Sequence, residues 1–188
     1  MTTAYIGMGG NLPSPAGPPE ATLAAAAERL TRLGRVVARS HLYSTSPVGI
    51  AGQPDFVNAV LALATDLNPH SLLLALLKIE REFGRDRNNE IRNGPRTLDL
   101  DILLFDDAVV REPALEIPHP RLFERAFVLV PLNEIAPNFR DPITGRSVTE
   151  WLHRLCPVPH YENLAVIRIQ SDLWRSSSEY NAGRGDET

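Results

Sequence analysis

Residues 98–105 carry the pattern that decides the fold, and they read Leu98-Asp99-Leu100-Asp101-Ile102-Leu103-Leu104-Phe105. Successive side chains of a β-strand point to opposite faces of its sheet, so residues two apart share a face. The pattern predicts a strand over this range, with Asp99 and Asp101 on one face. The opposite face is apolar and carries Leu98, Leu100, Ile102 and Leu104.

The elements before this strand complete a β-α-β-β-α-β order. We expect strands over residues 3–8, 35–43 and 55–64, and helices over residues 20–33 and 71–83. The first helix has apolar residues at helical spacing and ends at Gly34, which stands where a C-cap belongs. The second has Pro69 in its first turn and closes at Gly84. This order is typical of the α+β ferredoxin-like fold, an antiparallel sheet with two helices on one face.

The rest of the chain is predicted to form C-terminal extensions of this core. Short helices are expected near Arg121 and over residues 148–155, and a strand over residues 164–169. Prolines gather in residues 12–19, 113–120 and 131–142, and these segments are predicted to be fixed loops. We expect a single domain over residues 1–170. Residues 171–188 are expected to be a disordered tail, because the chain after residue 175 is polar, charged and nearly free of apolar side chains.

The composition limits the classes of function. The chain has 188 residues, of which 43% are hydrophobic, enough for one ordinary core. A formal net charge of −4 argues against a general nucleic-acid-binding protein, which usually has a basic excess. The single cysteine, Cys156, cannot form an internal disulfide. No signal-type segment or membrane-length apolar run is present, so we expect a cytoplasmic protein without a membrane partner. A monomer without nucleic-acid partners is also expected.

The acidic pair on the predicted strand indicates a metal site. Two carboxylates that point the same way suit Mg²⁺, which prefers oxygen ligands and is often bound by one or two carboxylates together with substrate phosphates. An ordinary solvated strand face is the alternative, and for an isolated Asp-x-Asp sequence it is the more common one.

Arginines crowd the helix end and the loop just before the acidic pair. They are Arg81, Arg85, Arg87, Arg92 and Arg96. Arginine suits phosphate recognition because its guanidinium offers a fixed fork of donors and keeps its charge. A salt-bridged loop that uses Glu82, Asp86 and Glu90 is the alternative. Basic and acidic groups on one strand and its entry loop favour phosphoryl chemistry.

A longer match joins these features to a known family. The run Arg92-Asn93-Gly94-Pro95-Arg96-Thr97-Leu98-Asp99-Leu100-Asp101-Ile102-Leu103 resembles the signature of the 6-hydroxymethyl-7,8-dihydropterin pyrophosphokinases. Matching segments on both sides include residues 43–49, 53–59, 117–120 and 125–129. The resemblance covers roughly residues 3–155 in family order, and the fold that it implies is the ferredoxin-like one.

The resemblance implies roles for individual residues. Asp99 and Asp101 would bind two Mg²⁺ ions, and Arg85 and Arg96 would grip the ATP phosphates and assist transfer. The pterin-binding positions are Thr45 and Val48, through their backbones, Asn58, through its amide, and the aromatic pair Phe56 and Phe127. The positions around ATP are Glu80, Arg87, Arg96, Ile102, His119 and Arg125.

The implied reaction is diphosphate transfer in folate biosynthesis. ATP would bind first and the pterin second, and the pterin hydroxymethyl oxygen would attack the β-phosphorus of ATP in line, with AMP leaving. The chain departs from the family pattern at three places. Gly10 stands for the usual serine before Asn11, Pro120 follows His119 where an aromatic residue often stands, and the loop 85–93 is one residue longer, with Asn93 in place of a tryptophan.

Two other classes of function remain possible from the residues alone. A two-metal phosphodiesterase would also place an acidic pair beside arginines, but it would need further carboxylates or a histidine cluster. A binding or regulatory module on a ferredoxin-like sheet would have exposed aromatic residues and a basic face on its central strands. Asp99 and Asp101 stand on that face instead.

Overall fold

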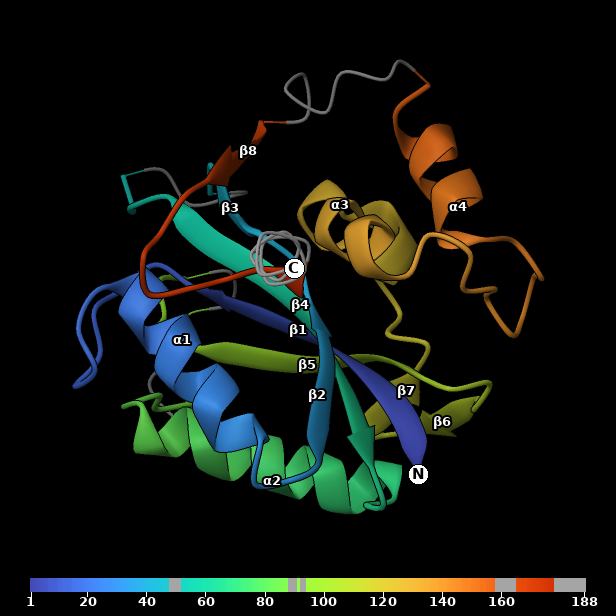
Figure 1. The fold of residues 1–188 in the computed structure, drawn as a ribbon, viewed down its shortest axis with the longest axis horizontal. Helices are drawn as coiled ribbons and strands as arrows, with labels where there is room; N and C mark the ends of the chain where they lie inside the picture. Colours follow the sequence, from blue (N-terminus) through green and yellow to red (C-terminus); the bar gives the residue numbers. More distant parts are fainter. Residues whose placement is uncertain (48–51, 88–90, 92–93, 158–164, 178–188) are drawn as a thin grey trace, which may run out of the picture.

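A six-stranded antiparallel sheet forms the centre of the molecule (Figure 1). The computed structural model describes residues 1–47, 52–87, 91, 94–157 and 165–177. The order along the sheet is β5-β1-β4-β3-β8, and β2 also pairs with β4. These strands are β1 (Thr2–Gly10), β2 (Arg35–Arg39), β3 (Leu42–Thr45), β4 (Phe56–Thr65), β5 (Asp99–Phe105) and β8 (Val166–Ile169). A separate hairpin joins β6 (Val110–Glu112) and β7 (Leu115–Ile117).

Helices cover both faces of the sheet. On one face lie α1 (Pro19–Leu30) and α2 (Pro69–Glu82), which bury their apolar sides in the larger hydrophobic cluster. On the other lie the short helix η1 (Leu122–Glu124), α3 (Ala126–Ile135) and α4 (Val148–Leu155), which pack in a second cluster (Figure 1). The predicted combination of helices with an antiparallel sheet, and the two helices on one face, are confirmed.

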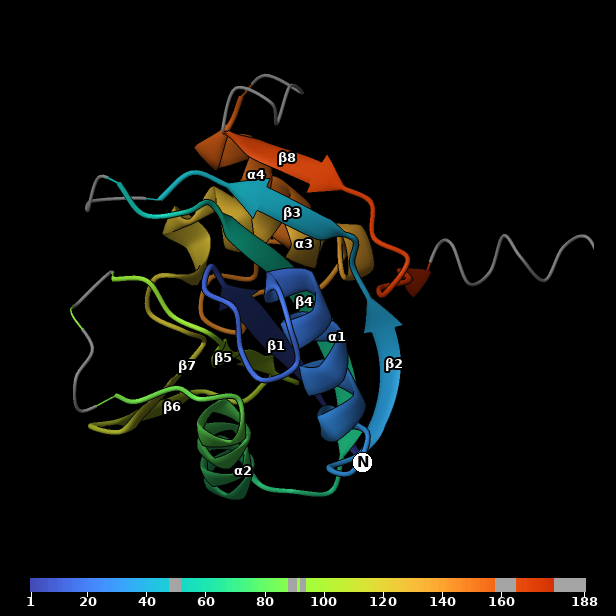
Figure 2. The same ribbon diagram turned by 90° about the vertical axis from the view of Figure 1, so that its left-hand side faces the viewer.

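The single strand predicted over residues 35–43 is wrong, because the chain breaks at Ser40 and His41. The Ser40 N–H donates to the Val60 carbonyl at 2.9 Å, but the Val60 N–H donates to the Ser40 hydroxyl oxygen at 3.0 Å instead of to a backbone carbonyl. The Ser40 hydroxyl thus replaces a backbone carbonyl as one acceptor of the sheet, and the strand bends at this point (Figure 2). As a result β2 and β3 pair with different halves of β4.

The alternation predicted for the acidic strand is correct only at its start. Tyr5 pairs with Leu104 and Ile6 with Ile102, so Leu103 is an extra residue in β5. Such a bulge reverses the faces beyond it. Leu103 and Leu104 therefore both join the cluster under α3, and the prediction that Leu104 shares a face with Ile102 is wrong.

The glycines after α1 and α2 have different structural roles. Gly84 follows α2 with a φ of +83°, a left-handed conformation that glycine adopts without strain, as predicted. Gly34 is not the C-cap of α1, which ends at Leu30. A side chain at Gly34 would place its Cβ 2.2 Å from the Ala64 carbonyl oxygen. Gly34 is therefore needed for a close approach of two backbones.

The C-terminal part contains more regular structure than the sequence predicts. Residues 131–142 are predicted to be a loop, but α3 extends to Ile135 with Pro131 inside it. Pro131 has no N–H to donate to the carbonyl of Phe127, four residues earlier. Residues 171–177, assigned to the tail, pack on the sheet: Trp174 is 4% exposed and donates to the Ser40 carbonyl at 2.8 Å. Residues 178–188 lie outside the described part of the chain.

Helix α4 begins at a capping box. The Glu150 N–H donates to the Ser147 hydroxyl oxygen at 3.1 Å, and the Ser147 N–H donates to a Glu150 carboxylate oxygen at 2.6 Å. The helix ends at Leu155, and the next residue, Cys156, is buried and is not part of a disulfide. Among the residues that the structure describes, no helix combines the length and the apolar character that a membrane crossing needs.

Candidate active site

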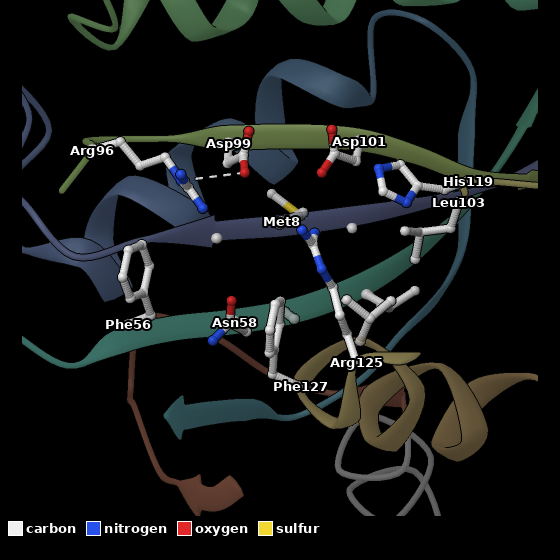
Figure 3. Close-up of a pocket in the computed structure, with 15 residues that line it drawn as sticks. Met8, Phe56, Asn58, Arg96, Asp99, Asp101, Leu103, His119, Arg125 and Phe127 are labelled. Carbon is white, nitrogen blue, oxygen red and sulfur yellow. Dashed lines mark ion pairs between the residues drawn. The ribbon is translucent and has the colours of Figure 1, made fainter. Parts of the chain in front are cut away.

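A cleft opens between the sheet and the N-terminal end of α3. Its narrow part lies over β1, β4 and β5 and is lined by eight of the residues predicted from the sequence: Phe56, Asn58, Arg96, Asp99, Asp101, His119, Arg125 and Phe127 (Figure 3). Its wider part, of about 470 Å³, also includes Thr45, Ser46, Pro47, Arg121 and Glu124. Residues from several strands of the sheet, from α3 and from the connecting loops therefore meet in one place.

The acidic pair points into the narrow part of the cleft from β5 (Figure 3). Arg96 Nε lies 3.2 Å from one Asp99 carboxylate oxygen, and an Arg85 nitrogen contacts the other. Burial raises the pKa of Asp99, but the guanidinium groups of Arg96 and Arg85 outweigh it and hold that pKa below its ordinary value. Asp99 is therefore a carboxylate at neutral pH.

Asp101 has the opposite electrostatic environment. Burial, and then the negative charges of Asp99 and Glu80, raise the pKa of Asp101 from 3.8 to about 7. A cation between the two carboxylates would relieve this repulsion. Mg²⁺ is commonly bound by one or two carboxylates when nucleotide phosphates supply other ligands, and this strand face offers two. The residues present therefore fit a phosphate-bound magnesium ion.

Glu80 lies behind the acidic pair, near the end of α2, and is 1% exposed. One of its carboxylate oxygens accepts the Leu100 N–H at 2.9 Å and an Arg85 N–H at 2.6 Å. The other accepts from Arg87 Nε at 2.9 Å. Burial raises the pKa of Glu80 in spite of Arg85, the Leu100 N–H and Arg87. Glu80 thus joins the arginine loop to β5.

Three residues expected around the nucleotide do not line the cleft. Glu80 faces the arginines described above, and Ile102 is 4% exposed in the hydrophobic cluster under α1 and α2. Arg87 is held at Glu80, with 49% of its side chain exposed. Arg85 also lies behind the cleft: its side chain is 6% exposed and contacts Asp99. Val48, Arg92 and Asn93 lie outside the described residues.

Two phenylalanines form the aromatic part of the cleft. Phe56 comes from the start of β4 and Phe127 from the first turn of α3. Each ring has an arginine over it: the guanidinium carbon of Arg96 is 5.1 Å from the Phe56 ring centre, and that of Arg125 is 5.6 Å from the Phe127 ring centre. Cations over aromatic faces are attracted to the ring quadrupole. The aromatic and cationic parts of the cleft are thus in direct contact.

His119 closes the cleft beyond Asp101 (Figure 3). Its backbone N–H donates to the Leu103 carbonyl at 2.9 Å, and its Nδ1 accepts the Arg121 N–H at 3.2 Å. Burial, followed by the charge of Arg125, lowers the pKa of His119. A neutral imidazole whose Nδ1 is an acceptor carries its proton on Nε2, so His119 can donate one hydrogen bond to a ligand.

Asn11 holds two segments of the cleft wall together, although the sequence analysis gave it no role. Its N–H donates to the Arg96 carbonyl and its Oδ1 accepts the Arg96 N–H, both at 2.9 Å. Its Nδ2 donates to the Pro54 carbonyl at 2.9 Å and to the Gln53 side chain at 3.2 Å. Asn11 therefore fixes the loop of Arg96 against the segment before Phe56. The only sequence feature that points to Asn11 is its position directly after Gly9 and Gly10, at the end of the first strand.

Comparison with known proteins gives a consistent result. The profile of the 7,8-dihydro-6-hydroxymethylpterin-pyrophosphokinase (HPPK) family matches residues 5–137. The 2-amino-4-hydroxy-6-hydroxymethyldihydropteridine pyrophosphokinase of Pseudomonas aeruginosa is 48% identical over 160 residues, which cover 85% of this chain and 95% of that protein. The protein of the same name from Methylorubrum extorquens is 46% identical over 159 residues, with 84% and 96% covered.

A solved structure with a similar fold has little sequence identity to this chain. A structure of Plasmodium falciparum HPPK-DHPS matches with a TM-score of 0.68 and 16% identity, covering 90% of this chain and 49% of that one. The chain thus spans about half the length of that protein, and this similarity shows the fold alone. The profile match and the two bacterial relatives show that the chain belongs to the HPPK family.

Proposed function

We propose that this chain transfers a diphosphate group from ATP to 6-hydroxymethyl-7,8-dihydropterin, giving AMP and the pterin diphosphate in folate biosynthesis. The observation that carries the proposal is that an acidic pair suited to Mg²⁺ and a pair of aromatic rings line the same cleft. A planar heterocycle between the rings would bring its substituent close to phosphates held at the acidic pair. We also infer that the βαββαβ core is of the ferredoxin-like type.

Asp99 and Asp101 would hold two magnesium ions together with the ATP phosphates. When bound, these ions neutralise the charge of the phosphates and lower the pKa of a coordinated hydroxyl group. Arg96 already lines the cleft beside Asp99, and it is suited to hold the oxygens of the transferred group. His119 and Arg125 supply further donors on the opposite side of the acidic pair.

The transition state of phosphoryl transfer spreads negative charge over the phosphate oxygens, so positioned donors are the main contribution of the protein. Arg96, His119 and Arg125 are such donors, and Arg85 would join them when it leaves Asp99. No covalent intermediate with a side chain is required. The attacking oxygen is that of the hydroxymethyl group, the leaving group is AMP, and the two lie in line on the β-phosphorus.

The pterin ring would stack between Phe56 and Phe127. Stacking suits a flat heterocycle, and the Asn58 amide offers both a donor and an acceptor to its polar edge. Thr45 lines the same part of the cleft. The two rings exclude water from the reacting atoms, which strengthens the electrostatic contacts within the cleft.

The test is to incubate the protein with ATP, Mg²⁺ and 6-hydroxymethyl-7,8-dihydropterin and to separate the nucleotide products. AMP in equal amount to pterin diphosphate is the expected result. ADP would indicate ordinary kinase action, and AMP with free diphosphate but no pterin product would indicate hydrolysis. Asp99→Ala, which removes a metal ligand and no core side chain, should be inactive and folded.

A further inference from the structure

The Asn58 amide is held on one side by the side chain of Thr45. Asn58 Nδ2 donates to the Thr45 hydroxyl oxygen at 2.8 Å, and each residue is only 7% exposed. Thr45 lies on β3, where its backbone is paired with β4 on one side and with Val166 of β8 on the other. The hydroxyl is therefore attached to a strand fixed at both edges.

On its other side the amide meets Gly9 of β1. A Cβ built on Gly9 would lie 2.8 Å from Asn58 Oδ1, so the second α-hydrogen of Gly9 points at that oxygen. A C–H group can donate weakly to an oxygen but cannot accept a hydrogen bond. The Gly9 side therefore favours the amide oxygen over the amide nitrogen. The Thr45 side provides the acceptor that the nitrogen requires.

The orientation of this amide matters because its two ends have nearly the same shape and opposite hydrogen-bonding character. Turned by 180°, Asn58 would present a donor where it now presents an acceptor. A heterocycle edge with a fixed order of donors and acceptors would then meet the wrong partners, and buried polar groups without partners weaken binding strongly.

We propose that the Thr45 hydroxyl is a positioning group that fixes the orientation of the Asn58 amide, with Gly9 excluding the alternative. The family resemblance gives Thr45 a backbone role only. This inference rests on the proposed pterin site at Asn58, and it assigns the side chain of Thr45 to substrate specificity. Thr45 acts through Asn58 and is not itself a catalytic residue.

The matched variants are Thr45→Val, which keeps the shape without the hydroxyl, and Thr45→Ser, which keeps the hydroxyl. We expect Thr45→Val to raise the pterin dissociation constant and KM about 5- to 100-fold, the range for a misdirected buried hydrogen-bonding group. The ATP dissociation constant should change less than twofold, and Thr45→Ser should bind the pterin nearly as wild type does. Equal pterin affinity in Thr45→Val and wild type would overturn the proposal.

The decisive measurement repeats Thr45→Val in an Asn58→Ala background. A positioning group has nothing left to position there, so the second substitution should have no further effect on pterin affinity. A loss of the same size in both backgrounds would show that Thr45 contacts the ligand itself and would overturn the proposal. Gly9→Ala tests the opposite contact of the same amide, because its Cβ would displace the Asn58 oxygen. It should therefore lower pterin affinity only while Asn58 is present.

Gly9→Ala, measured in the wild-type and Asn58→Ala backgrounds, replaces this test if Thr45→Val does not fold. A loss of pterin affinity that occurs only while Asn58 is present supports the inference, and a loss of equal size in both backgrounds contradicts it. Failure of the proposed function has a different signature. A wild-type protein that makes no AMP, or an Asn58→Ala variant with unchanged pterin affinity, would remove the pterin site itself. Wild-type activity with an Asn58 effect but no Thr45 effect would remove only the positioning role.

Discussion

The carboxylate of Glu80 accepts the backbone N–H of Leu100 at 2.9 Å, and Leu100 is the residue between Asp99 and Asp101. The same oxygen accepts from Arg85 at 2.6 Å. One buried group on α2 thus holds both β5 and an arginine that contacts Asp99. Glu80 is therefore linked to the cleft through Leu100 and Arg85, although its side chain does not line the cleft.

We therefore expect Glu80→Ala to be destabilised by roughly 2–4 kcal/mol, because it leaves the buried Leu100 N–H without its acceptor and removes one carboxylate from Arg85 and Arg87. Glu80→Gln keeps an amide oxygen for Leu100 and should lose less, about 1 kcal/mol. Urea unfolding monitored by circular dichroism measures both values. Equal stability of the two variants would show that the Leu100 hydrogen bond is not what Glu80 provides.

Arg96 should contribute more to the rate than to binding. It lies in the cleft with 24% of its side chain exposed, and its backbone is fixed by Asn11. Loss of a donor that is strengthened in the transition state should cost roughly 2–4 kcal/mol of barrier, about thirty- to a thousand-fold in turnover. Single-turnover rates and ATP dissociation constants of Arg96→Ala separate the two effects. A loss confined to ATP affinity would make Arg96 a simple binding residue.

Arg85 should give a different result because it is paired with Asp99 in this structure. Arg85→Ala should lower the single-turnover rate, since the guanidinium is lost from the transition state. It should also tighten Mg²⁺ binding to the nucleotide-free protein several-fold, because Asp99 loses a competing cation. Calorimetric titration with Mg²⁺ measures the second effect. Weaker Mg²⁺ binding in the variant would contradict the competition, and Arg87→Ala, which removes an arginine held at Glu80 instead, is the control.

Asp101 should make the metal-free protein less stable as the pH rises. Its pKa is about 7 in the folded state and near 3.8 in the unfolded state, so the folded state binds more protons between these values. The stabilising contribution is present below about pH 4 and is lost as the pH rises through about 7. Asp101→Asn should therefore exceed wild type in stability by roughly 1–3 kcal/mol above pH 7, and by little near pH 4.

Urea unfolding in the presence of a chelator, from pH 4 to pH 8, measures this difference. Mg²⁺ with ATP should reverse the order at pH 8, because ligands that bind only the folded state stabilise it and the variant lacks a ligand for the ion. A stability difference that does not change with pH would show that Asp101 is not titrating in this range.

The sequence could predict the elements with strong local patterns. The helix after Pro69 and the positions of Asp99 and Asp101 follow from local spacing, and the structure has them as predicted. The break at Ser40 could not be predicted, because it depends on a hydroxyl that replaces a carbonyl in pairing with Val60, twenty residues away. The bulge at Leu103 depends likewise on pairing with β1.

The candidate site shows the same division. The family resemblance supplied eight of the fifteen residues that line the narrow part of the cleft, but it could not show which of the expected residues act indirectly. Glu80 was expected at the nucleotide and is buried behind the strand. Asn11 had no assigned role, because its four hydrogen bonds go to segments about 42 and 85 residues away, which spacing along the chain does not bring together.

Gly10 lies against the backbone that carries Arg96, and this contact supports the last prediction. A Cβ on Gly10 would lie 2.3 Å from the Thr97 carbonyl oxygen and 3.5 Å from the Arg96 carbonyl oxygen. The Asn11 N–H and the Leu12 N–H both donate to that Arg96 carbonyl, at 2.9 and 3.1 Å. In this backbone arrangement a side chain at Gly10 must push the Arg96 segment away from β1, and the hydrogen bonds from Asn11 must lengthen.

We expect Gly10→Ala to lower stability by about 1–3 kcal/mol and turnover at least tenfold, because an active-site group displaced by about 1 Å loses much of its effect. The control is Gly145→Ala, which meets no atom within 4 Å but has a φ of +73°, so it should lose stability without losing turnover. In an Arg96→Ala background the turnover penalty of Gly10→Ala should largely vanish while its stability penalty persists, because the displaced group is already absent. Wild-type stability and turnover in Gly10→Ala would mean that the two backbones separate easily, and that their close approach does not position Arg96.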